Sequence, residues 1–144
     1  MTQAFDLSEM PGWTEMVDYF GFEPTFHDAE VIGVDFKRSP LPITISIHTW
    51  RMTNEVDAKG FYVLDRHATV NFILLGGQII AFKGWNHQNV LSEISIMREV
   101  SQSGISRTVV HLNSIFGLEA HFDADTVVVE LIPGNPTKSD ASPE

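Results

Sequence analysis

The stretch Ile43-Thr44-Ile45-Ser46-Ile47-His48 alternates apolar and polar residues without interruption. A period of two places the isoleucines on one face of a strand and the polar residues on the other. The same alternation returns at residues 64–74 and at residues 118–122. Strands of this kind are typical of antiparallel sheets that cover a core with one face. The sequence therefore predicts a mainly β protein.

Further strands are expected on both sides of this centre, at residues 32–36, 79–82, 110–112 and 127–132. In the first of these, Ile32, Val34 and Phe36 alternate with Gly33 and Asp35.

Turn residues suggest how the strands are connected. Gly76-Gly77 predicts a hairpin between residues 64–74 and 79–82. Asp123-Ala124-Asp125 predicts a tight turn before the last strand, and the polar residues 53–60 predict a loop. Residues 89–100 fit a strand and also a helical spacing, and we expect a strand.

One helix is expected near the N-terminus, at residues 11–20. Trp13, Met16, Val17 and Phe20 form an apolar stripe, and Pro11 suits the first helical position. So short a helix needs a sheet to pack on. The predicted fold is therefore mainly β (α+β), with an N-terminal helix packed on a strongly bent antiparallel sheet or small sandwich of roughly seven or eight strands.

The length of 144 residues is that of a single domain. We expect residues 1–132 to form one globular domain and residues 133–144 to form a disordered polar tail. No apolar run approaches the roughly 18 residues that cross a bilayer, and the N-terminus lacks the pattern of a secretory signal. The chain has no cysteine, which excludes disulfides and thiolate sites. The expected location is the cytoplasm.

The charge is strongly negative and unevenly distributed. Nine basic residues against nineteen acidic ones give a formal net charge of −10, and no Lys or Arg precedes Lys37. Such an acidic opening segment repels nucleic acid and anionic membranes and attracts a basic partner. The alternative explanation is simple solubility.

The run Phe26-His27-Asp28-Ala29-Glu30 places three ionisable side chains where the helix gives way to the first strand. A metal site at His27 and Asp28 would need further ligands, and the other five histidines show no short ligand spacing. In a structural role, Asp28 would cap the turn, His27 would bridge it to a neighbouring loop, and Phe26 would lie in the core. Contact with a partner is the third possibility. We expect no catalytic residue, metal or cofactor.

A second polar cluster runs from Trp85 to Asn89 and contains one aromatic ring, one imidazole and three amides. These side chains suit two roles. They can satisfy backbone groups at a sheet edge, or they can present a hydrogen-bonding surface to a partner.

Three stretches together resemble a known bacterial family. They are Phe20-Gly21 with Pro24 and residues 26–31, then residues 84–91 (GWNHQNVL), then residues 116–122 (FGLEAHF) running into residues 127–129. In this order and spacing the chain resembles immunity protein 50, although Trp85 stands where Phe is expected. The resemblance covers roughly residues 13–130. It implies a non-enzymatic protein that binds and blocks a toxin, and it carries over no catalytic residue.

The leading hypothesis is an immunity protein that neutralises a cognate toxin, expected to be basic, through an acidic surface. One alternative is a small metal-dependent hydrolase that uses His27 and Asp28, and another is an accessory domain without catalysis. The candidate partner-binding residues are Glu15, Asp18, Glu23, His27, Asp28, Glu30, Trp85, His87 and Asn89.

Overall fold

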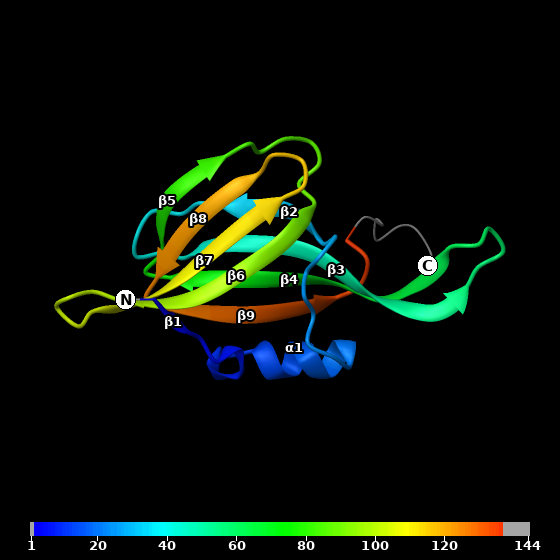
Figure 1. Ribbon diagram of the computed structural model, residues 1–144, viewed down its shortest axis with the longest axis horizontal. Coiled ribbons are helices and arrows are strands. Elements are labelled where there is room, and N and C mark those ends of the chain that lie inside the picture. Colours follow the sequence, from blue (N-terminus) through cyan, green and yellow to red (C-terminus); the bar gives the residue numbers. More distant parts are fainter. Residues whose placement is uncertain (1, 137–144) are drawn as a thin grey trace.

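The computed structural model describes residues 2–136 and shows two antiparallel sheets packed face to face (Figure 1). One sheet has the order β1 (Thr2–Ala4), β6 (Leu91–Val100), β7 (Ser106–Ser114), β8 (Glu119–Ala124) and β5 (Gln78–Lys83). The other has the order β2 (Glu30–Asp35), β3 (Ile43–Val56), β4 (Tyr62–Leu75) and β9 (Thr126–Pro133). The predicted mainly β class is confirmed, and so is the strand at residues 89–100.

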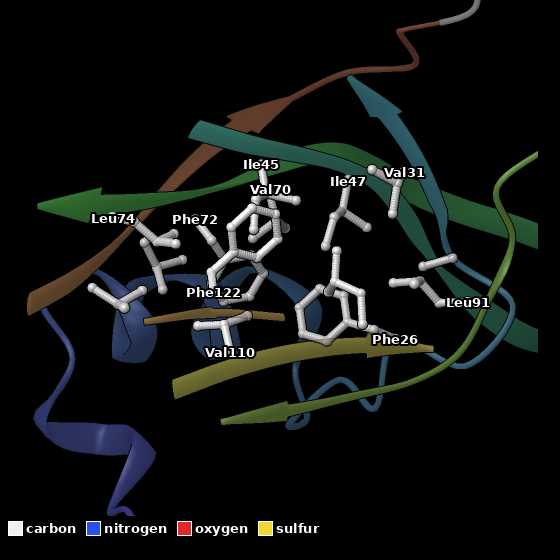
Figure 2. Packing of buried hydrophobic residues seen from close by; sticks show 14 of the residues in the cluster. Phe26, Val31, Ile45, Ile47, Val70, Phe72, Leu74, Leu91, Val110 and Phe122 are labelled. Atoms are coloured by element: carbon white, nitrogen blue, oxygen red, sulfur yellow. The ribbon is translucent and has the colours of Figure 1, made fainter. Parts of the chain in front are cut away.

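The alternating stretches supply the core between the sheets. Ile45 and Ile47 of β3 are fully buried, and so are Phe72 of β4 and Phe122 of β8. Figure 2 shows these side chains meeting from both sheets. The polar residues of the same strands face away from this core, as the period of two requires.

The N-terminal segment contains a short 3-10 helix, η1 (Leu7–Glu9), and one α-helix, α1 (Trp13–Phe20). The stripe turns Trp13, Met16 and Phe20 into the core, and α1 contacts β9 and β4 (Figure 1). The predicted start at Pro11 is wrong by two residues, because Pro11 O accepts a hydrogen bond from Val129 N–H of β9. Gly12 follows with a φ of 89°, and a Cβ there would lie 1.8 Å from Val129 O.

The predicted hairpin at Gly76-Gly77 is wrong. β4 pairs with β3 and β9, whereas β5 pairs with β8, so the chain crosses from one sheet to the other at this point. It crosses back between β8 and β9, at Asp125. Arg107 holds both crossings, because its guanidinium bonds to Asp123, Asp125 and Gly76 O.

The alternation of residues 32–36 is broken by a β-bulge between Val31 and Gly33. The bulge buries Val31 and leaves Ile32 exposed. Phe36 lies beyond the end of β2 and is also exposed, with its ring against those of Phe82 and Phe122. A bulge inserts one residue into the alternation, and for this reason the predicted apolar face was only partly right.

The predicted loop at residues 53–60 is shorter in the structure, because β3 runs to Val56 and β4 begins at Tyr62. β2 pairs with β3 no further than His48, and β9 pairs with β4 only from Ala68. Residues 49–67 therefore form a two-stranded ribbon, which we call the arm. Figure 1 shows it extending beyond the rest of the two sheets.

At the C-terminal end, β9 includes Pro133, and Gly134 N–H donates to His67 O. Residues 137–144 of the predicted tail lie outside the described residues. Within residues 2–136, no helix is both long enough and apolar enough to cross a membrane.

Candidate functional site

The segment from Pro24 to Asp28, which we call the His27 turn, has an unusual backbone. Phe26 and Asp28 have φ values of 62° and 68°, in the left-handed region. This conformation costs an L-residue roughly 1–2 kcal/mol. Asp28 N–H donates to Leu91 O, Leu91 N–H donates to Ala29 O, and Ala29 N–H donates to Phe26 O. The start of β6 therefore holds the turn in this shape.

Phe26 anchors the turn in the core. Its ring is buried, as expected, and lies edge-on to Phe72 with the ring centroids 5.5 Å apart. With the backbone bonded to β6 and Phe26 in the core, the two residues that follow point outward. A strained backbone that its surroundings hold in place is a common feature of functional sites.

His27 and Asp28 lie at the surface, each with 61% of its side chain exposed. His27 Nδ1 donates to Ser92 O at 3.0 Å, so this side chain bridges the turn to strand β6 and not to the expected neighbouring loop. Asp28 Oδ1 is 3.7 Å from His27 Nε2, and the Asp28 carboxylate caps no backbone N–H among the described residues. The predicted capping role is therefore wrong, and the carboxylate is free to bind another group.

Two grooves flank the His27 turn and share its residues 24–27. The first, which we call the helix groove, has a volume of about 490 Å³. It is lined by Phe5, Leu7 and Trp13, by Glu23 and the turn, and by side chains between Ser92 and Met97 of β6. The second, which we call the arm groove, has a volume of about 320 Å³ and is lined by Phe22, the turn, Thr49, Trp50 and Met52. The turn is thus a ridge between two concave surfaces.

The base of the arm carries polar groups that are bonded to each other. Arg51 makes two hydrogen bonds to the Asp65 carboxylate. This hydrogen bonding is the largest cause of the lowered pKa of Asp65. His48 Nε2 lies 3.0 Å from His67 Nδ1. Burial, and then the neighbouring His67 ring, lower the pKa of His48 below its usual value.

The farther part of the arm exposes large apolar side chains. Phe61 is 69% exposed, and Met52, Val56, Tyr62 and Leu64 are exposed as well. The arm carries no net formal charge, because its three basic residues balance its three acidic ones: Arg51, Lys59 and Arg66 against Glu55, Asp57 and Asp65.

The loop from Trp85 to Asn89 is held by its own side chains. Asn86 Nδ2 donates to Gly84 O and Phe116 O, and Asn89 Nδ2 donates to Asn86 O. Asn89 is only 3% exposed, so its side chain serves the loop and offers no contact surface. The Trp85 ring stacks on Phe82 and His87 is exposed.

This loop also joins the three stretches that the sequence singled out. Val31 N–H donates to Asn89 O, which links the loop to the segment after the His27 turn. On its other side, a Cβ on Gly84 would lie 2.0 Å from Gly117 O, so only glycine allows this close approach. The three stretches are therefore neighbours in the fold.

The structure brings only some of the predicted site residues together. Glu23, His27 and Asp28 line the two grooves. Glu15 and Asp18 are exposed on α1, Glu30 is half-buried at the start of β2, and the Trp85 ring packs on β5. Among the described residues, no three His, Asp or Glu side chains are grouped so that they could hold a metal ion.

Sequence reasoning missed Glu93, Trp50 and Met52, which line the same grooves. Glu93 and Trp50 lie in strands whose patterns give no sign of a site. The pairing of β6 with the turn brings Glu93 near His27. The base of the arm lies beside the turn and brings Trp50 and Met52 near it. No signal in the sequence alone identifies them.

Comparison with known proteins gives one family. The model of immunity protein 50 matches residues 13–134, which is most of the chain. The search of curated proteins found no match, and neither did the search of solved structures. The matched range begins at α1 and ends just after β9. It includes the His27 turn, the arm groove and the helix groove apart from Phe5 and Leu7. The chain belongs to the immunity protein 50 family.

Proposed function

We propose that this protein is a non-enzymatic antidote that binds a cognate bacterial toxin in the cytoplasm and blocks it. The family description supports an immunity role. Binding by itself accounts for such a role, because a bound protein can cover the active surface of a toxin without any chemistry of its own.

The observation that carries this proposal is the His27 turn. The chain tolerates two non-glycine residues in the left-handed region in order to present His27 and Asp28 at the surface. His27 Nδ1 is fixed on Ser92 O, which leaves Nε2 and the Asp28 carboxylate facing outward. A rigid pair of polar groups between two grooves can bind a partner without first paying a large ordering entropy.

The charge distribution supports a basic partner. Glu15, Asp18 and Glu23 are exposed, and none of them bonds to another described side chain. Unpaired surface carboxylates attract a positively charged protein and raise the rate of encounter. A toxin that acts on nucleic acid would carry such a positive surface, since its own substrate is negative.

Co-expression tests the proposal. The cognate toxin, sought among the genes next to the gene for this protein, is induced in bacteria together with the wild-type protein or with the double variant His27→Gln/Asp28→Asn. The variant replaces the carboxylate at position 28 by an amide and keeps the backbone conformation accessible, because Asn also tolerates the left-handed region. The matched control, His111→Gln/Glu119→Gln, removes one imidazole and one carboxylate from β7 and β8.

We expect growth with the wild type and the control, and reduced growth with the variant at equal protein levels. If the wild type fails to protect the cells and fails to bind the purified toxin, the proposed function is wrong. If the His27 and Asp28 variant protects as well as the control, the function stands and the contact surface lies elsewhere.

A further inference from the structure

The outer edge of β6 is only partly occupied. β1 pairs with residues 97–99 of β6, and Ala29 bonds to Leu91 at the other end. Between these points, residues 93–96 pair with β7 on one side, and no described strand pairs with them on the other. A row of N–H and C=O groups at an open edge is a template for a further strand.

This open stretch borders the helix groove. Glu93, Ile94 and Ile96 all line the groove, beside Leu7 of η1. β1 already shows that an antiparallel segment fits on this edge of β6. Four extended residues cover about 13 Å, so the space between β1 and the His27 turn suits a short extended segment.

The groove is negatively charged. Glu23 and Glu93 line it, and no Lys or Arg is among its lining residues. Glu23 bonds to no other described residue, and Glu93 accepts one hydrogen bond, from Asn113 Nδ2 at 3.3 Å. The guanidinium of Arg98 is held nearby, over the Phe5 ring and on Ser106 Oγ. Apolar walls beside two available carboxylates fit the stem and the charged head of a lysine or arginine.

We propose that the helix groove binds an extended segment of the toxin, paired with the open edge of β6, and that this segment places a lysine or arginine between Glu23 and Glu93. This inference rests on the proposed function above. A second copy of this chain is a poorer occupant, because two chains of formal charge −10 repel each other.

Dissociation kinetics of the complex test the inference. The purified toxin identified by co-expression is the probe, and wild type is compared with Glu23→Gln/Glu93→Gln. The control Asp35→Asn/Glu119→Gln removes the same charge from exposed ion pairs with Lys37 and Lys83. We expect the groove variant to raise the dissociation rate constant at least about tenfold, because a desolvated charge pair acts mainly on dissociation. The control is expected to dissociate like the wild type.

Hydrogen exchange tests the strand pairing separately. Amides at residues 93–96 that do not bond to β7 are expected to exchange more slowly in the complex than in the free protein. If the wild type binds but the groove variant dissociates like the control, or if these amides keep their exchange rates, the groove inference is wrong and the proposed function remains. If the wild type does not bind the toxin, the proposed function itself is wrong.

Discussion

At the scale of single residues, the strained backbone of the His27 turn explains why its residue types matter. Asp28 has a φ of 68°, a conformation that Asp and Asn adopt more readily than other residues with a Cβ. Its carboxylate lies near the exposed His27 ring and makes no hydrogen bond to the backbone among the described residues. The side chain is therefore free for binding, while the backbone restricts which residue can stand there.

Two substitutions at Asp28 separate these roles. Asp28→Asn is expected to leave the free energy of unfolding within about 0.5 kcal/mol of wild type, since it keeps the left-handed conformation accessible. Asp28→Val should lower it by about 1–2 kcal/mol, because a β-branched residue is strained there. Urea denaturation measures both, and equal stability of the two variants would show that the turn is not strained.

The pairing of buried His48 with half-buried His67 predicts a dependence of stability on pH. The pKa of His48 is lowered in the folded protein, first by burial and then by His67. As the pH falls below the usual histidine value of 6.5, the unfolded chain binds a proton that the folded protein resists. The free energy of unfolding is therefore not reduced by His48 above that pH, and it declines as the pH falls through it.

Denaturation at pH 7.5 and pH 5.5, two conditions on either side of about 6.5, measures this loss. We expect His48→Gln to lose less stability between these conditions than the wild type does. His87→Gln, at an exposed loop position, is the control and should behave like the wild type. An identical loss in the His48 variant would assign the pH dependence to other groups.

At the scale of helices and strands, the sequence was reliable where a pattern depends on local geometry. Alternation located β3 and β4 because their apolar faces meet the core over many residues. The turn residues misled at Gly76-Gly77, and alternation failed at Ile32, because a sheet crossing and a bulge depend on which strands pair. The same limit applies to the site. The run at residues 26–30 is visible in the sequence, whereas Glu93 joins it only through the register of β6.

The C-terminal segment gives a prediction at this scale. β9 ends at Pro133, and residues 137–144 contain Ala141 as their single apolar residue. We expect a chain that ends at Pro136 to keep the melting temperature and the toxin affinity of the full chain, because the removed residues offer almost nothing to bury. A lower melting temperature would show that this segment packs on the domain.

At the scale of the whole molecule, we propose that the acidic N-terminal segment is the part of the surface that meets the toxin. The segment before Lys37 contributes η1, α1, the His27 turn and all of β2, and it contains no Lys or Arg. Elsewhere several acidic residues are paired, as Asp65 is with Arg51 and Asp123 with Arg107. Of the acidic residues before Lys37, Glu23 and Asp28 line the two grooves, and we propose that they meet the toxin first.

The association rate constant with the toxin, measured at increasing salt concentration, tests the central claim most directly. The variant Glu15→Gln/Asp18→Asn/Glu23→Gln is compared with wild type and with the charge-matched control Glu55→Gln/Glu99→Gln/Glu119→Gln. Exposed charges interact over about 8 Å at physiological salt, so position matters as well as net charge. We predict slower association of the first variant at low salt, a smaller effect in the control, and convergence of all three proteins at high salt. Association of the first variant at the wild-type rate in low salt would contradict the claim that the toxin meets this acidic surface.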